Sequence, residues 1–126
     1  GNPVSAAAGK AQIEYMTGKY AELNKRSSEL IGSLRDSMED SGTAGCVNGV
    51  GSMMSVFFDV DPVKNGTQAS GTNRETFNGL FRHMLDNGIY LAPSALEAWF
   101  VSVEHSEEDI SATAEAFDSF VKREKK

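Results

Sequence analysis

The sequence lacks most of the residue patterns on which self-sufficient enzyme sites are built. Cys46 is the only cysteine among the 126 residues, so no internal disulfide can form and a metal site built on cysteine spacing is excluded. The two histidines, His83 and His105, do not fall in the HExxH pattern and are too few for a typical zinc site. No Walker phosphate-binding loop is present either. The residues alone therefore predict no complete active site.

Long apolar runs and excess positive charge are also missing. No apolar run is long enough to span a bilayer and no signal-peptide pattern occurs, so we expect no membrane partner. The formal net charge of −6 and the sequence pI of about 4.8 argue against nucleic-acid binding, because a phosphate backbone selects a basic surface. The basic run at 122–126 is predicted to be a solvated tail. The single free thiol fits a reducing compartment, and we expect a cytoplasmic protein.

The hydrophobic pattern predicts four helices. Asn2 and Pro3 favour a helix start, and the alanine-rich segment that follows is expected to form a linker helix within residues 1–18. Residues 19–40 carry apolar side chains at spacings of three and four, which predicts a second helix. Capping boxes that begin at Thr72 and at Ser106 predict the starts of the other two.

Four short apolar segments predict strands. Residues 45–52 and 53–58 are expected to form two strands with a tight connection, and 59–72 a loop. Residues 89–91 read as the end of a short strand, and 99–103 as another. The predicted fold is α+β: one domain over residues 19–126, with a small three- to four-stranded, mostly antiparallel sheet covered by helices.

Several residues invite a functional reading that their context does not support. Gly49 and Gly51 resemble the start of a dinucleotide-binding loop, but Met54 occupies the place of the third glycine and a strand follows instead of a helix. Cys46 has no basic residue near it in sequence, so nothing predicts an activated thiolate. We expect His83 to lie at the edge of an apolar helix face, and His105 to form a local hydrogen bond.

The segment 90–103 organises the rest of the chain. Apolar runs flank a centre of Pro93, Ser94, alanine and Glu97, and Pro93 must break or turn the chain because it cannot donate to a sheet ladder. Glu97 is therefore expected in a loop or at a strand start. Loops held by rigid strands often carry binding groups. The carboxylate is either solvated at the end of the sheet or directed into a cleft, and the residues leave both alternatives open.

Three blocks in order resemble the C-terminal part of the glutamate-1-semialdehyde 2,1-aminomutase family, within the class III aminotransferases that use pyridoxal phosphate. The blocks are residues 1–9, residues 48–58 and, most specifically, residues 81–110. The resemblance covers nearly the whole chain but only about the last third of the family's usual length. The first residue is glycine, not methionine. We therefore expect a fragment with the fold of the C-terminal small domain of fold-type I pyridoxal-phosphate enzymes.

The resemblance also implies a division of roles. In the family the cofactor-binding lysine belongs to the large domain, so we expect no cofactor in the isolated chain and no activity from it. Glu97 is implied as the acidic residue that faces the substrate, with Ser94 close to the substrate. The expected partner is the large catalytic domain of the parent enzyme. The parent reaction would form 5-aminolevulinate for tetrapyrrole biosynthesis.

Two positions depart from the family's pattern. The family usually has glycine where Trp99 stands and alanine where Glu104 stands. A bulky indole two residues from Glu97 would narrow the cleft or pack against a surface that the missing domain covers. These departures keep a second hypothesis open: a stand-alone, non-catalytic interaction or oligomerisation module, derived from that domain, that self-associates.

Overall fold

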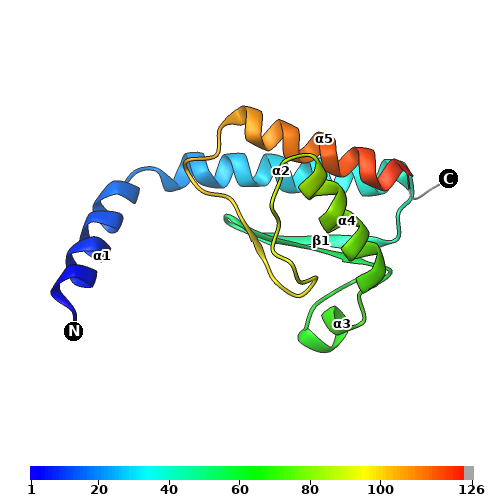
Figure 1. The fold of residues 1–126 in the computed structure, drawn as a ribbon, viewed down its shortest axis with the longest axis horizontal. Helices are drawn as coiled ribbons and strands as arrows, with labels where there is room; N and C mark the ends of the chain where they lie inside the picture. Colours follow the sequence, from blue (N-terminus) through cyan, green and yellow to red (C-terminus); the bar gives the residue numbers. More distant parts are fainter. Residues whose placement is uncertain (124–126) are drawn as a thin grey trace.

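The computed structural model describes residues 1–123, and the end of the predicted basic tail, 124–126, lies outside the described residues. The apolar stripe of helix α2 (Tyr20–Ser41) forms the centre of a helical layer above the sheet (Figure 1). This helix ends at Gly42, whose φ of 68° is the left-handed conformation that glycine adopts without a steric cost. The side chains that α2 buries recur at spacings of three and four: Leu23, Ser27, Leu30, Ile31, Leu34, Ser37, Met38 and Ser41.

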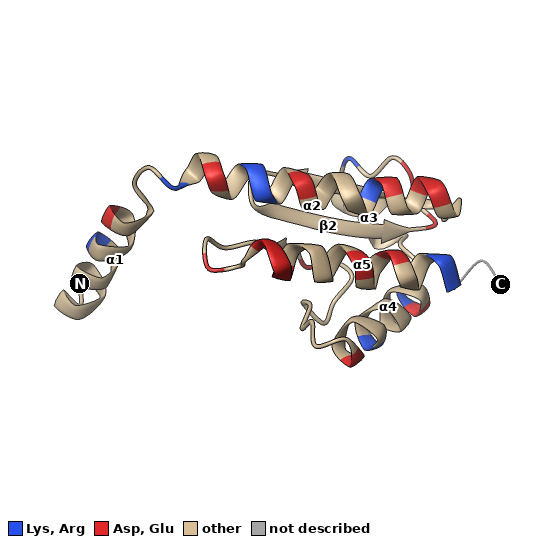
Figure 2. Cartoon of the chain, turned by 90° about the horizontal axis from the view of Figure 1, so that it is seen from above, with Lys and Arg blue, Asp and Glu red and all other residues tan. Residues whose placement is uncertain are grey.

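Helix α5 (Glu107–Arg123) packs along α2, and helix α4 (Arg74–Asp86) packs against α5 and strand β2 (Met53–Phe58). Figure 2 shows α2 and α5 side by side, with acidic residues spread along both helices. Phe77, Leu80 and Met84 of α4 are buried, and Phe58 meets Phe120 edge to face at 6.3 Å between ring centroids. The helices therefore share one apolar core with one face of the sheet.

The sheet has three antiparallel strands in the order β1-β2-β3. β1 (Gly45–Val50) pairs with β2 (Met53–Phe58), and β2 pairs with the short β3 (Trp99–Phe100). The connection between β1 and β2 turns at Gly51, with φ of 55°. Val47, Met54 and Trp99 are buried on the side of the helices. The predicted α+β fold, with a small antiparallel sheet covered by helices, is confirmed.

The predicted strand at 89–91 is wrong, and the predicted strand at 99–103 is shorter than expected. Ile89 continues the end of α4 by donating its N–H to the Met84 carbonyl at 2.9 Å, and Leu91 is buried through its side chain without a ladder partner. Beyond β3, Val101 donates to the Ser52 carbonyl at 3.0 Å and then the chain turns. A short apolar run indicates burial, but burial here does not require strand pairing.

Two further local predictions are wrong. The segment 59–72 is not all loop, because it contains the short helix α3 (Gly66–Ser70), whose cap Asn65 accepts a hydrogen bond from the Gln68 N–H at 3.0 Å. The cap of α4 is Asn73 and not Thr72. Thr72 is buried, and its hydroxyl accepts the Phe58 N–H at 2.9 Å instead. The second predicted box is confirmed, since Ser106 and Asp109 bond each other's backbone N–H.

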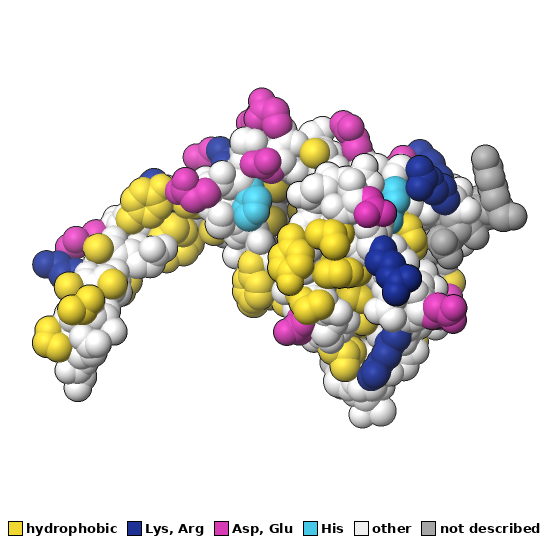
Figure 3. Space-filling model, viewed as in Figure 1, with side chains coloured by type: hydrophobic (Ala, Val, Ile, Leu, Met, Phe, Trp, Pro, Cys, Tyr) yellow, Lys and Arg dark blue, Asp and Glu magenta, His cyan; other side chains and the backbone are white. Residues whose placement is uncertain are grey.

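Helix α1 (Pro3–Met16) begins as predicted, with the Asn2 side chain accepting the Val4 N–H at 2.9 Å. None of its residues is buried, and it extends away from the other helices (Figure 1). Figure 3 shows hydrophobic side chains along it. Gly18, with φ of 83°, lies in the turn that separates α1 from α2. The division of the chain into residues 1–18 and 19–126 stays a prediction.

Candidate functional site

Ser94 and Glu97 lie in one tight turn between the buried Leu91 and strand β3. The Glu97 N–H donates to the Ser94 carbonyl at 3.0 Å, and the Leu96 N–H donates to Ser94 Oγ at 3.2 Å. The buried side chain of Ala95 anchors this turn against the core. The sequence therefore holds Glu97 at a defined place on a turn fixed at both ends.

The Glu97 side chain itself is exposed. Among the described residues 1–123, no side chain or backbone group donates a hydrogen bond to its carboxylate. Of the two alternatives for Glu97, the structure of this chain shows the solvated one. Any cleft around this carboxylate needs a second wall from outside these residues.

Trp99 lies beneath the turn and not on its surface. Its side chain is buried, and its Nε1–H is a buried donor without a partner among residues 1–123. It contributes to the wall of a partly open pocket of about 250 Å³, together with Leu30, Met54, the exposed Tyr90 and Thr113. The indole therefore belongs to the apolar core of this chain. The expected narrowing of a cleft, or packing against a surface that another domain covers, stays a prediction.

Glu104 has a clear local role. Its Oε1 accepts a hydrogen bond from the Tyr15 hydroxyl at 2.6 Å, which joins helix α1 to the connection between β3 and α5. Lys19 Nζ lies 3.3 Å from the centre of the Tyr15 ring, a cation–π contact at the same junction. The Arg26 guanidinium donates to the His105 carbonyl at 2.7 Å and so holds the same connection to α2.

Both histidines have the structural roles that were expected. His83 Nε2 lies 3.0 Å from the Ala116 carbonyl and 2.8 Å from Ser119 Oγ, which ties α4 to α5. His105 Nδ1 accepts the Ser102 N–H at 2.9 Å, which closes a local turn. Each imidazole lies beside a serine hydroxyl, Ser119 Oγ for His83 and Ser102 Oγ at 3.1 Å for His105, but within residues 1–123 no carboxylate bonds either ring as a catalytic triad requires. The structure does not bring the two histidines and Cys46 together.

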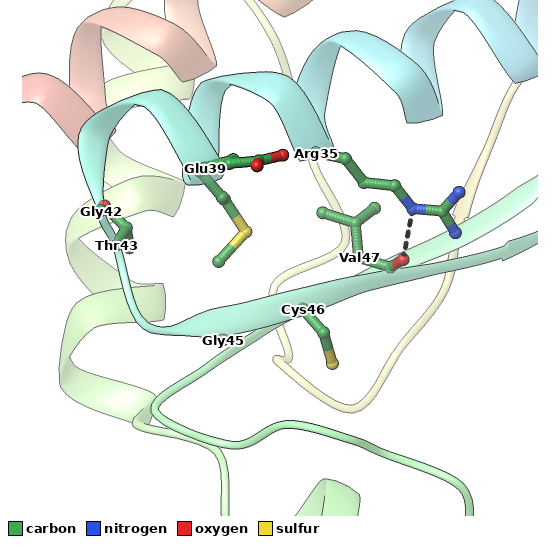
Figure 4. A pocket seen from close by; sticks show the side chains of 8 residues that line it. Arg35, Glu39, Gly42, Thr43, Gly45, Cys46 and Val47 are labelled. Carbon is green, nitrogen blue, oxygen red and sulfur yellow. Dashed lines mark hydrogen bonds between the residues drawn. The ribbon is translucent and has the colours of Figure 1, made fainter.

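A second pocket, of about 410 Å³, lies between the end of α2 and β1 (Figure 4). Arg35 reaches it from α2 and donates Nε–H to the Val47 carbonyl at 3.0 Å. Figure 4 shows the Cys46 side chain pointing away from α2. Partial burial raises the pKa of the Cys46 thiol, which disfavours the reactive thiolate. The pocket therefore holds no activated nucleophile.

Within residues 1–123, no three His, Cys, Asp or Glu side chains gather in a way that could hold a metal ion. None of the helices in the same range is both long enough and apolar enough to cross a membrane.

Comparison with solved structures defines the class of protein. A solved transaminase with pyridoxal phosphate bound superposes with a TM-score of 0.77 over 98% of this chain and 28% of its own, at 27% sequence identity. An omega-transaminase from Sphaerobacter thermophilus superposes with a TM-score of 0.78 over 95% of this chain, and at 18% identity it shows the fold alone. The chain therefore has the fold of one part of a pyridoxal-phosphate transaminase.

Sequence comparison identifies the nearer relatives. Glutamate-1-semialdehyde 2,1-aminomutase of Methanopyrus kandleri is 37% identical over 125 residues, and that of Thermus thermophilus is 42% identical over 119 residues. These alignments cover 98% and 92% of this chain but only 29% and 28% of the relatives. No family model matches the chain. The chain thus corresponds to the C-terminal part of glutamate-1-semialdehyde 2,1-aminomutases, and spans less than a third of their length.

Proposed function

We propose that this chain is the C-terminal domain of a pyridoxal-phosphate-dependent glutamate-1-semialdehyde 2,1-aminomutase, with residues 1–18 as its linker helix. The observation that carries the proposal is the alignment with the Methanopyrus kandleri enzyme over 98% of this chain. The transaminase fold supports it independently. The parent reaction exchanges an amino and an oxo group between neighbouring carbons to give 5-aminolevulinate, and we place the protein in the cytoplasm.

The surroundings of the described lysines support a cofactor site outside this chain. Lys10, Lys25 and Lys122 each face a carboxylate one helical turn away, and Lys19 rests on the Tyr15 ring. Lys64 lies in the connection between β2 and α3. No lysine is among the residues that line the pocket at Trp99 or the groove at Ala98, on either side of β3. We therefore propose that the cofactor and its lysine belong to the part of the parent protein that this chain does not match, and that the isolated chain is inactive.

Glu97 is the residue through which this domain is proposed to act on the reaction. It is exposed on a turn whose backbone is fixed, so a carboxylate at this place can face a ligand held by another domain. A fixed negative charge repels a second carboxylate on the substrate, and this repulsion would favour a semialdehyde. Ser94 supports this geometry, because its hydroxyl and carbonyl oxygens accept the N–H groups of Leu96 and Glu97.

A domain graft tests the proposal. The C-terminal part of the Thermus thermophilus relative would be replaced by this chain, and conversion of glutamate 1-semialdehyde to 5-aminolevulinate measured. We expect an active graft. Glu97→Gln should lower kcat/KM by about tenfold or more, which corresponds to about 1.4 kcal/mol of transition-state free energy. Asp86→Asn, at an exposed α4 residue, is the matched control. A folded graft without activity would contradict the proposal.

One observation favours a second candidate, a non-catalytic module that self-associates. Helix α1 contains no buried residue although it carries Val4 and Ile13, both well exposed. Such a helix is marginal alone in water and would gain from an apolar partner. Sedimentation of the 126-residue chain distinguishes the candidates. A stable dimer together with an inactive graft would support the module, whereas a strict monomer at high concentration would rule it out.

A further inference from the structure

The two faces of the sheet differ in how they are covered. Side chains alternate between the faces along each strand, and the helices cover the face that carries Met54 and Trp99. Val50, Met53 and Phe100 are cross-strand neighbours in register and point to the opposite, outer face. They are 69%, 42% and 65% exposed, respectively. Three large apolar side chains thus lie together in solvent on one patch.

The chain itself covers the other end of this outer face. Phe57 also points outward, yet it is only 7% exposed. The connection after β2 folds back over this end, and the Asn48 side chain donates to the Val63 carbonyl at 2.7 Å. One half of the outer face is therefore packed inside this chain, while the half that carries Val50, Met53 and Phe100 is left bare.

The bare half of the outer sheet face carries a shallow groove and no charged residue. A shallow groove of about 300 Å³ runs over it, lined by Val50, Met53, Ser55 and Ala98, and Ala98 directly follows Glu97. The three strands contain no charged residue, whereas acidic residues line the exposed sides of α2 and α5 (Figure 2). Covering the groove would bury apolar area without desolvating a charge. Exposed apolar patches of this kind mark interaction sites.

We propose that the bare sheet face, formed by Val50, Met53 and Phe100, is the docking surface for the N-terminal part of the parent polypeptide. The occupant follows from the proposed function, on which this inference rests: the relatives are more than three times as long, and this chain matches only 28% or 29% of them. Helix α1 descends from α2 toward the side on which the sheet lies, so the chain enters from that side (Figure 1).

This assignment gives the Ser94–Glu97 turn a second wall. Ala98, which directly follows Glu97, lines the groove, so an occupant seated on Val50 and Met53 also reaches the strand end that carries the Ser94–Glu97 turn. Burial of these three large apolar side chains would stabilise the assembly. Docking on the sheet face would therefore also bring the occupant close to the turn that carries Glu97.

Cysteine labelling tests the assignment without depending on activity. In a Cys46→Ser background, Val50→Cys reports on the bare face and Leu85→Cys, an exposed residue of α4, serves as the control. Labelling rates would be compared between the 126-residue chain and the Thermus thermophilus graft. We expect at least about tenfold protection of Val50→Cys in the graft, because an occluded thiol reacts only when the contact opens. The labelling of Leu85→Cys should be unchanged.

Each other result has a defined meaning. Equal labelling of Val50→Cys in both proteins would overturn the assignment, and so would protection that appears in the isolated chain as its concentration rises, since a second copy would then be the occupant. Phe100→Ser gives a second measurement: it should lower the Tm of the graft by more than that of the isolated chain, where the ring is already exposed. If the graft is inactive but still protects Val50→Cys, the proposed function is contradicted while the docking surface is supported.

Discussion

Trp99 carries a buried hydrogen-bond donor that has no partner among residues 1–123. Its side chain is buried beneath the Ser94–Glu97 turn, yet its indole N–H has no acceptor within residues 1–123. An unpaired buried donor costs about 1–3 kcal/mol, so Trp99 offsets part of what its apolar area contributes. The ring is nevertheless too large to lose without leaving a void beside the existing pocket.

Substitutions at Trp99 separate these two effects. Trp99→Phe removes the unpaired donor and keeps most of the apolar contact, so the free energy of unfolding should change by less than about 1 kcal/mol. Trp99→Ala opens a cavity and should cost about 3–5 kcal/mol. Urea unfolding followed by circular dichroism measures both variants. Equal losses in the two variants would show that the indole N–H is not an unsatisfied group.

For Glu97, the sequence predicted the turn but not the groups that surround the carboxylate. Pro93 and the flanking apolar runs place Glu97 in a turn, which the structure shows. Whether the carboxylate faces solvent or a cleft depends on a wall that residues 1–123 do not supply. Likewise, the Tyr15–Glu104 hydrogen bond spans 89 residues, and no local pattern signals a contact of that range.

Among the elements, α2, α4 and α5 were predictable because each carries an apolar stripe over several turns. α3 was missed because five residues contain no such stripe. The α4 cap was misplaced by one residue because Thr72 and Asn73 are both good capping residues, and only burial decides between them. Once Thr72 is buried against Phe58, its hydroxyl is already occupied. The sequence thus offers two possible capping residues, and the burial of Thr72 leaves Asn73 as the cap of α4.

The start of α5 gives a pH-dependent prediction. The backbone N–H and hydroxyl of Ser106 both donate to Asp109, and these bonds lower the pKa of the Asp109 carboxyl below its usual 3.8. Because this pKa is lower in the folded than in the unfolded chain, the contribution of Asp109 to stability is present at pH 7. It is lost as the pH falls below 3.8 through the lowered pKa.

Asp109→Asn should therefore destabilise the protein at pH 7, and its deficit relative to the unsubstituted chain should shrink below about pH 3.8. Urea unfolding at a series of pH values measures the difference. Asp36→Asn, at an exposed residue of α2, is the control substitution. A deficit that stays constant down to pH 2 would contradict the proposed capping role.

Helix α1 gives a prediction about geometry. The Tyr15–Glu104 hydrogen bond is exposed, so its loss should cost less than about 1 kcal/mol of stability. The same loss should broaden the distribution of α1 positions, because α1 then keeps only the contact of Met16 with the core, next to the turn at Gly18. Spin labels at Val4→Cys and Ser119→Cys, in the Cys46→Ser background, would report this as a wider distance distribution in Tyr15→Phe.

Glu104→Gln is the matched variant for that experiment. It keeps a hydrogen-bond acceptor for the Tyr15 hydroxyl, so its distance distribution should remain close to that of the unsubstituted chain. Identical, narrow distributions in all three proteins would show that other contacts set the position of α1.

For the whole molecule, the central feature is a well-packed α+β fold that carries only one side of a site. Glu97 and Ser94 are held in place by the turn and the core, while half of the outer sheet face is bare. The alignment with the C-terminal part of much longer relatives accounts for both features together. On this account the chain contributes a wall and a carboxylate, and the cofactor is held elsewhere.

The most direct test of this account is the intact mass of the chain after treatment with pyridoxal phosphate and borohydride. We predict that the 126-residue chain gains no stoichiometric pyridoxyl group. The Thermus thermophilus graft should gain one group per polypeptide, on a lysine outside residues 1–126. One stoichiometric adduct on a single lysine within residues 1–126 would contradict the account, because the chain would then carry its own cofactor site.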